Sequence, residues 1–287
     1  MLPPQPIALA RLLLDVPAGF SCEFEGDGTV AAIPDDAPDR FTLRFSILTV
    51  SPEQDAPNPT AVDLVSNTLE RGKAEGLKTV RAGDKAWYEE EKFSEENGVP
   101  IWLRFWVVGF QNYQIFISLC CSSDAKDDAL VAEACSEMPQ IIATIRDRPP
   151  TSALTQIESD SLNDQRALIL DLLRDRYDAF QAPKLRSDLI ALQRIIDDRV
   201  FSPEQEYEWT CLGVAFGDVL ANELDLEWVI QCDEYGVEPA LNLADPSITL
   251  YPRTMLLKRV ENGETPDVSF LFEKLSESVE QLRRDPS

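Results

Sequence analysis

The chain has 287 residues, 44% of them hydrophobic, which is long enough for two packed domains and excludes global disorder. Its 26 basic and 51 acidic residues give a formal net charge of −25. This charge excludes nucleic acid and anionic membranes as partners and favours a basic protein, although solubility alone also selects acidic surfaces. The chain has no histidine, so Ser-His and Cys-His nucleophile pairs and nearly all catalytic zinc sites are excluded.

The first 20 residues, MLPPQPIALARLLLDVPAGF, lack the basic start of a signal peptide, and Arg11 and Asp15 interrupt their short apolar run. The six cysteines form no C-x-x-C pair and are expected to be reduced, buried side chains. Together these observations predict a cytoplasmic protein. Short strands are expected next, in GFSCEFEG, in VAAIP and over residues 41–50, where apolar and polar residues alternate.

A helix is expected over residues 63–76, with Thr60 as its N-cap. Three strands follow it, over residues 85–93, 99–109 and 113–121. The first two are joined by an Asn-Gly pair, which is the preferred sequence of a tight hairpin turn.

The most apolar stretch of the chain, residues 99–121, is long enough to span a bilayer. However, Arg104 lies early in it, the polar sequence QNYQ lies near its middle, and its aromatic and β-branched content is typical of strands. It is therefore predicted to form the centre of an antiparallel sheet that has one face covered by helices. The closing helix is expected over residues 126–148, kinked or split at Pro139.

This order of strands, helix, three strands and helix resembles the PsbP-like fold over residues 15–146. The resemblance rests on VPAGF before a strand, the long helix, the aromatic hairpin and the closing helix. It implies an α+β domain that is used for binding and has no catalytic motif. The first domain is predicted at residues 1–148, and a linker at 149–163 begins with two prolines.

The second domain, residues 164–287, is predicted to be the more helical one. Its helices are expected at 164–181, 184–201, 202–224 and 266–284, and its short strands at 226–236, 239–243 and 247–252. Ser202 is expected to cap the third helix. Both domains are thus predicted to be α+β, each an antiparallel sheet packed with helices.

The second half also resembles a bacterial domain family of unknown function over residues 165–284. The residues that carry this resemblance are FSPEQEYEWTCLGVAFGDVLANELDLEWV, DEYGVEPAL and YPRTMLLKRVENG. The resemblance implies no activity. Gly213 and Gly217 lie four residues apart in the first of these segments, where they allow either close packing or a ligand contact. No phosphate-binding glycine motif occurs, so no cofactor is predicted.

Two acidic groups are the candidate partner-binding residues. The first is a set of glutamates in and after a predicted strand: Glu89, Glu90, Glu91, Glu95 and Glu96. The second surrounds a predicted turn, where acids beside an aromatic ring favour Lys and Arg: Asp233, Glu234, Tyr235 and Glu238. For the first group, the alternatives are a charged hairpin edge, a cation site or an acid–base pair. For the second group, the alternative is a capped turn. No catalytic, cofactor-binding or metal-binding residue is assigned.

Three classes of function remain. The hypothesis that we adopt is a non-catalytic acidic binding protein, an immunity protein or chaperone that neutralises a cognate basic bacterial toxin or effector by direct binding. Complementary charge would speed such capture. The alternative is a general cytosolic scaffold or accessory protein without a toxin partner. The third class is an enzyme that uses carboxylates alone, for which the sequence offers no geometry.

Overall fold

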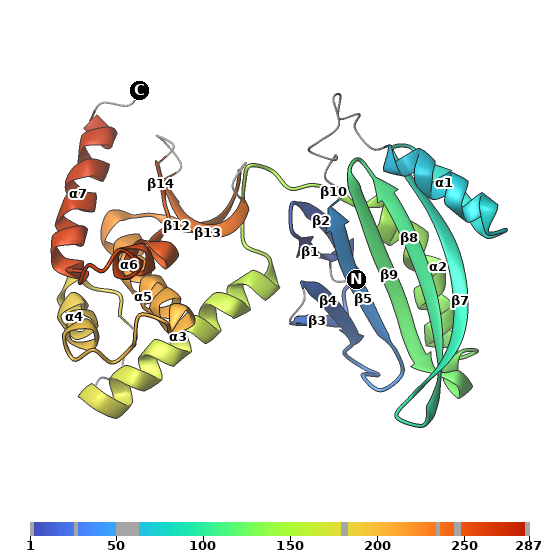
Figure 1. Ribbon diagram of the computed structural model, residues 1–287, viewed down its shortest axis with the longest axis horizontal. Helices are drawn as coiled ribbons and strands as arrows, with labels where there is room; N and C mark the ends of the chain where they lie inside the picture. Colours follow the sequence, from blue (N-terminus) through green and yellow to red (C-terminus); the bar gives the residue numbers. More distant parts are fainter. Residues whose placement is uncertain are drawn as a thin grey trace. The chain divides into compact units, whose positions relative to one another are not determined.

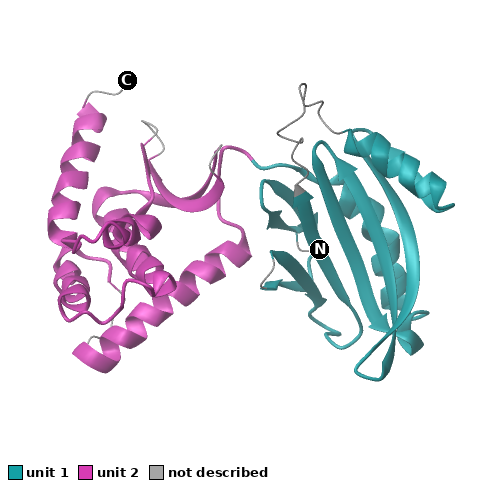
Figure 2. Cartoon of the chain, viewed as in Figure 1, with its two compact units in different colours: residues 1–148 teal, residues 149–287 magenta. Residues whose placement is uncertain are grey.

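The computed structural model describes residues 3–25, 28–49, 63–178, 183–233, 236–243 and 248–284. The chain divides into two compact units, Met1–Arg148 and Pro149–Ser287 (Figure 2). This division falls where the first predicted domain ends. Both units combine antiparallel strands with helices, and the second is the more helical, so the predicted α+β class is confirmed. No helix in the described ranges is long and apolar enough to cross a membrane.

Unit 1 is built on a seven-stranded antiparallel sheet with the order β3-β4-β5-β9-β8-β7-β6 (Figure 1). Its strands are β3 (Phe20–Glu25), β4 (Thr29–Pro34), β5 (Thr42–Thr49), β6 (Lys78–Ala82), β7 (Lys85–Glu96), β8 (Val99–Phe110) and β9 (Tyr113–Ser122). The three strands predicted around the aromatic hairpin are confirmed as β7, β8 and β9. The apolar stretch 99–121 therefore lies inside the sheet.

A second, three-stranded sheet in unit 1 was not predicted. It consists of β1 (Gln5–Leu9), β2 (Leu12–Val16) and β10 (Arg146–Asp147). Consecutive residues of β1 and β2 are buried, so these strands have a continuous apolar run instead of the alternation that marks a half-buried strand. The turn between them has Ala10 at φ 49°, a position that glycine or asparagine usually takes, so the usual turn signal is also missing.

The two helices of unit 1, α1 (Leu64–Ala74) and α2 (Ala129–Ala143), cover opposite faces of the large sheet. A Cβ at Gly109 of β8 would collide with the Leu64 carbonyl oxygen of α1. Trp102 and Arg104, which have the opposite parity on the same strand, line a pocket with residues of α2. The expectation that only one face carries helices is therefore wrong. Sequence periodicity shows which strand residues are buried, but it does not show which helix buries them.

The ends of these helices differ from the predicted ones. Asp63 is the N-cap of α1 and accepts a hydrogen bond from the Ser66 amide at 3.0 Å, whereas Thr60 lies outside the described residues. Helix α2 continues through Pro139 without splitting. Met138 and Ile142, on either side of the proline, are fully buried, and this packing compensates for the lost backbone hydrogen bond.

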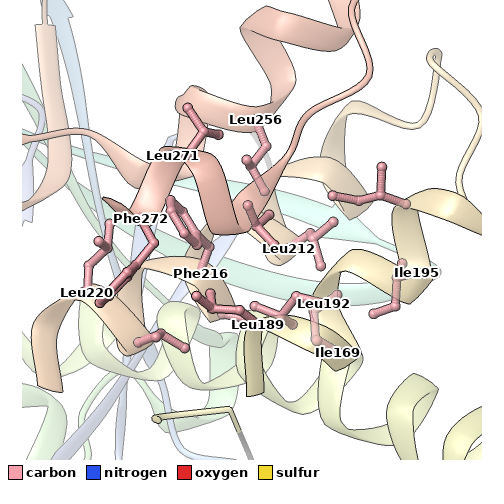
Figure 3. Close-up of a cluster of buried hydrophobic side chains, with 14 of the residues drawn as sticks. Ile169, Leu189, Leu192, Ile195, Leu212, Phe216, Leu220, Leu256, Leu271 and Phe272 are labelled. Carbon is pink, nitrogen blue, oxygen red and sulfur yellow. The ribbon is translucent and has the colours of Figure 1, made fainter. Parts of the chain in front are cut away.

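Unit 2 combines a four-stranded antiparallel sheet with helices. The strands are β11 (Thr151–Ser152), β12 (Glu227–Asp233), β13 (Gly236–Leu243) and β14 (Ile248–Leu250). The helices are α3 (Gln156–Tyr177), η2 (Arg186–Asp188), α4 (Leu189–Asp197), α5 (Glu206–Leu224), α6 (Pro252–Glu261) and α7 (Val268–Arg284). Helix α5 supplies the centre of the core, where Leu212, Phe216 and Leu220 are fully buried among side chains of α4, α6 and α7 (Figure 3).

Three local predictions in unit 2 need correction. The expected linker 149–163 contains β11 and the start of α3, which is capped by Thr155. Helix α5 begins at Glu206, because Ser202 is part of a turn in which its amide donates to the Gln205 side chain at 2.9 Å. The strand expected to reach residue 252 ends at Leu250, and Pro252 takes the first position of α6, where a missing amide hydrogen costs nothing.

Gly213 and Gly217 let three elements of unit 2 approach closely. A Cβ at Gly213 would lie 2.5 Å from the carbonyl oxygen of Pro252. A Cβ at Gly217 would lie 2.6 Å from the indole ring of Trp228 on β12. Of the two interpretations of these glycines, the structure therefore favours close packing of α5 against α6 and the sheet.

Candidate functional site

The most exposed regular structure in unit 1 is the end of the β7–β8 hairpin, residues 91–100, which we name the hairpin arm. All ten of its residues are exposed. The turn at its tip has Asn97 at φ 51° and Gly98 at φ 80°, the left-handed conformations that a tight hairpin turn requires. Two large apolar side chains lie on the arm, Phe93 with 66% and Val99 with 53% of its surface exposed.

At the base of the arm, Glu89 is held inside a network of cations. Its side chain is only 10% exposed, and its two oxygens accept hydrogen bonds from Lys78 Nζ at 3.1 Å and from Arg104 Nη2 at 2.6 Å. Arg104 also lies over the Trp106 ring, with 5.4 Å between its guanidinium carbon and the ring centroid. This arrangement stabilises the sheet and leaves Glu89 little capacity to bind a partner.

The charges of this network agree with its geometry. Burial works to raise the pKa of Glu89, but the hydrogen bonds from Arg104 and Lys78 outweigh burial, so the pKa is lowered and the carboxylate is ionised at neutral pH. Burial works to lower the pKa of Arg104, but the hydrogen bond to Glu89 and the nearby negative charges together outweigh burial, so this pKa is raised. Both groups stay charged, as an ion pair requires.

The network forms one wall of a pocket of ≈490 Å³ between the sheet and α2. Its charged lining residues are three cations and three anions: Lys78, Arg104, Lys126, Glu89, Glu91 and Asp127. Cys135 of α2 also lines it, and burial raises the pKa of this thiol, so it is not a reactive thiolate. The balanced charge gives the pocket no preference for an anion or a cation.

The other glutamates of the first group are spread over both faces of the hairpin. Glu91 shares the face of Glu89 and lies 3.4 Å from Arg104 Nη1, while Glu90 lies on the other face and pairs with Lys92 at 3.0 Å. Glu95 and Glu96 are exposed at the end of the arm. The five residues thus do not make one acidic surface. At the end of the arm, Glu95 shares the face of Phe93, and Glu96 shares the face of Val99.

The second acidic group lies in unit 2, and its described members contact their own chain. Asp233 accepts hydrogen bonds from the Gly236 amide at 3.2 Å and from the Tyr251 hydroxyl at 3.4 Å. Glu238 is half-buried near Arg253, whose pKa is lowered by burial and raised less strongly by Glu238. Glu234 and Tyr235 lie outside the described residues. The described part of this group therefore has the geometry of a capped turn.

The sequence interpretation missed the apolar part of the arm. Phe93 and Val99 flank the acids that were singled out, but an apolar residue in a strand is normally expected to be buried. The length of the hairpin contained the signal. Among the described strands, β6 pairs with β7 only as far as Glu89, and β9 pairs with β8 only as far as Ile101, so the β7 edge of the arm and Val99 have no strand beside them outside the hairpin. Within the described ranges, no group of three or more acidic or cysteine side chains could hold a metal ion.

The chain is thus an α+β protein of two units, and one family model matches part of the second unit. Residues 188–272 match the family described as Domain of unknown function (DUF3806). This match confirms the predicted uncharacterised domain, with narrower limits than the expected 165–284. A comparison with curated proteins finds no match.

Among solved structures, a crystal structure from Bacteroides thetaiotaomicron VPI-5482 covers 92% of this chain and 94% of its own, with 18% identity and a TM-score of 0.52. The two folds therefore occur together in that chain as well.

Two further structures match about half of this chain. One is the solution structure of cyanobacterial PsbP (CyanoP) from Synechocystis sp. PCC 6803, with 15% identity and a TM-score of 0.22, covering 48% of this chain and 86% of its own. The other is LpqN, involved in cell envelope biogenesis of Mycobacterium tuberculosis, with 14% identity and a TM-score of 0.31, covering 51% and 86%. Likenesses with TM-scores this low carry no argument about the family or the function of this chain.

Proposed function

We propose that the protein is a non-catalytic binding protein that holds a basic protein partner on its hairpin arm. The observation that carries this proposal is that each face of the arm presents an exposed apolar side chain beside a glutamate: Phe93 with Glu95 on one face, and Val99 with Glu96 on the other. Binding hot spots commonly combine a large apolar anchor with charged groups around it. An arm that extends beyond its sheet can present such residues to a partner without rearrangement of the fold.

Charge favours a basic partner over an acidic one. The net charge of −25 attracts cations over a long range and speeds their encounter. At short range, Lys126 Nζ already lies 5.7 Å from the centroid of the Phe93 ring, so this ring accepts a cation. An arginine or lysine of the partner would take a similar position and pair with Glu95, which shares the face of Phe93.

In its specific form, the proposal is an immunity protein or chaperone that neutralises a cognate basic toxin or effector in the cytoplasm. The proposal that it is no enzyme is supported by the lack of histidine and by the raised pKa values of the buried thiols, about 11 for Cys121. The alternative remains a general cytosolic scaffold or accessory protein, whose contacts would be numerous and weak.

The test is affinity capture from the source lysate at low and at moderate salt, with the intact chain as bait. The arm variant Phe93→Ala/Glu95→Gln/Glu96→Gln is compared with Glu70→Gln/Glu133→Gln, which removes the same charge from exposed positions of α1 and α2. We expect one stoichiometric basic partner that survives moderate salt, binds the control variant and is lost with the arm variant. Mass spectrometry of that partner would then test whether it is a toxin.

Two results would contradict the proposal. Scattered basic proteins that all elute as salt rises would mean that the charge is a solubility feature, and the scaffold alternative would then be favoured. A single partner that binds the arm variant as well as the intact chain would show that the arm is not the binding surface.

A further inference from the structure

The outer edge of β7 has no strand beside it along the hairpin arm. Strand β6 pairs with β7 only as far as Glu89, whereas β8 pairs with β7 as far as Glu96. Within the described ranges, none of the backbone hydrogen bonds formed outside helices and strands involves residues 91–96, and all six of these residues are exposed. This edge is therefore a row of backbone donors and acceptors that are open to solvent.

The turn of the arm decides which backbone groups point outward. In a two-residue hairpin, the residues that flank the turn form a hydrogen-bonded pair. Here these residues are Glu96 and Val99, which are partners in the register. Hydrogen-bonded and non-bonded pairs alternate along an antiparallel ladder, so the backbone groups of Glu91, Phe93 and Glu95 point away from β8.

The side chains of these three outward-facing residues lie on one face of the arm. Phe93, the central one, is 66% exposed, and Lys126 Nζ lies 5.7 Å from the centroid of its ring. Glu91 lies 3.4 Å from Arg104 Nη1, while Glu95 forms no ion pair or hydrogen bond with any residue that the structure describes. A strand added at this edge would place every second side chain beside Phe93 and its two glutamates.

Charge along the edge is balanced at the base of the arm. Residues 90–96 contain four glutamates and one lysine. Glu90 pairs with Lys92 at 3.0 Å, and Glu91 pairs with Arg104. These two glutamates already have partners within the chain, so an added cation would gain little beside them.

The tip of the arm is more open to a cation than its base. Glu95 has no ion pair among the described residues, and Glu96 lies on the other face. Arg44 interacts electrostatically with Glu96, but its guanidinium is hydrogen-bonded to Glu25 at 3.0 Å. A partner that brings one cation to each face of the tip therefore complements the charge that the chain leaves there.

A second copy of this chain would fit the same edge poorly. An antiparallel pair of β7 edges centred on Phe93 would place Glu91 opposite Glu95 and Glu90 opposite Glu96, each pair twice. Like charges directly opposite each other destabilise a strand pair. The glutamates thus protect the edge against its own copy and leave it open to a strand of opposite charge.

We propose that the basic partner adds an extended segment to the β7 edge as an antiparallel strand. Neighbouring strands of the large sheet all pair in this direction. Backbone hydrogen bonds supply the affinity of such a contact, and alternate side chains supply its specificity. Because the partner is the one of the proposed function, strand addition rests on that function and specifies the segment that binds.

The register defines the sequence of that segment. An antiparallel strand passes Glu96 first, then Glu95, and reaches Phe93 two residues later. From its N-terminus, the segment therefore has two basic residues, any residue and an apolar residue. The basic residues pair with the glutamates on opposite faces, and the apolar residue packs on the Phe93 ring.

The probe is a synthetic heptapeptide with blocked ends, Lys-Lys-Thr-Val-Thr-Lys-Thr, added to the intact chain and followed by NMR. We expect a dissociation constant of about 1 mM or lower. At about ten times that concentration, hydrogen exchange of the Glu91, Phe93 and Glu95 amides should slow about tenfold. The amides of Lys92 and Ser94, which face β8, should change little. A partner held by side chains alone would not produce this alternation.

Two matched comparisons separate the backbone from the side chains. The same peptide with N-methyl groups on its valine and its second and third lysines keeps every charge but loses the amide hydrogens that face β7, so it should bind about tenfold more weakly or worse. In the chain, Glu95→Gln removes a charge, and Glu95→Pro removes the same charge and the outward amide. Proline is tolerated at a strand edge. Glu95→Pro should therefore raise the dissociation constant about fivefold above that of Glu95→Gln. Thermal unfolding checks that both variants fold.

Equal binding of the methylated and the parent peptide would overturn strand addition. If that binding is nevertheless lost in the arm variant, the proposed binding surface stands and its side chains alone make the contact. A parent peptide that does not bind, or that protects no alternate amides, would also overturn strand addition. The proposed function would in that case be decided by the capture from lysate, which does not use the peptide.

Discussion

Glu89 illustrates how a neighbouring strand decides the role of a single acidic residue. The strand period correctly places Glu89 and Glu91 on one face and Glu90 on the other. It does not show that Arg104 of β8 lies opposite Glu91, where it can bond both acids of that face. The acidic residues of the candidate site were therefore predictable from the sequence, while its ion pairs required the register of the hairpin.

The pH dependence of stability should reveal this role of Glu89. Its pKa is lowered in the folded chain, so the carboxylate stabilises the fold above its unfolded pKa of about 4.3, and this contribution is lost as pH falls through the lower folded value. Glu89→Gln should reduce the free energy of unfolding by about 1.5–3 kcal/mol at pH 7, the usual contribution of hydrogen bonds to a charged group. The difference from the intact chain should shrink as the pH falls below about 4.

Urea unfolding at several pH values measures this difference. Glu95→Gln, at an exposed position of the same strand, is the control and should change stability little at any of them. A deficit for Glu89→Gln that is as large at acid pH as at neutral pH would show that the carboxylate acts through packing and not through charge.

Among the secondary-structure elements, those with a clear local signal were found and those without one were missed. Helix α7 and strand β9 have apolar periodicity, whereas β7 and β8 were predicted from their aromatic and β-branched content and the Asn-Gly turn between them. By contrast, β1 and β2 are buried in consecutive positions, and the five-residue β6 has the polar sequence KTVRA. These strands are specified by the partners that they pair with, which a local pattern does not contain.

The start of α3 is a case where a local signal was present but assigned to a linker. Thr155 and Glu158 form a capping box: the Glu158 side chain accepts from the Thr155 amide at 2.8 Å, and the Thr155 hydroxyl accepts from the Glu158 amide at 3.4 Å. The two prolines a few residues earlier suggested a break in structure instead. The break and the helix start are both present: the two prolines precede α3, and the capping box forms its first turn.

Removing this cap should destabilise unit 2 measurably. Thr155→Ala deletes the hydroxyl of a side chain that is only 4% exposed and should lower the free energy of unfolding by about 1 kcal/mol. Thr155→Ser keeps the hydroxyl and should recover most of that loss. Denaturant unfolding followed by circular dichroism measures both, with Ser161→Ala in the exposed interior of α3 as a neutral control. Equal losses for the Ala and Ser variants would mean that the methyl group of Thr155, not its cap, matters.

At the scale of the whole molecule, the excess of acidic over basic residues affects association with other molecules more than it affects folding. The two units have separate cores, and each combines surface ion pairs with many unmatched acids. Net charge is the property that the sequence predicts most directly, because it needs no structure. How that charge is distributed around exposed apolar side chains such as Phe93 could not be predicted, because it depends on which apolar residues the fold leaves at the surface.

The net charge of −25 should make the folded chain less stable at low salt than at moderate salt. Like charges repel more strongly in the compact state, and the screening length falls from about 30 Å at 10 mM to about 8 Å at 150 mM salt. Ion pairs weaken over the same range, but exposed pairs contribute at most about 1 kcal/mol each, so the loss of repulsion should dominate. The midpoint of thermal unfolding, measured on dilute protein so that self-association is absent, should therefore rise with NaCl at neutral pH.

Near the isoelectric point the rise of the unfolding midpoint with NaCl should vanish or reverse, which serves as the control. A midpoint that falls with salt at neutral pH would instead mean that networks such as Arg104 with Glu89 outweigh the net repulsion.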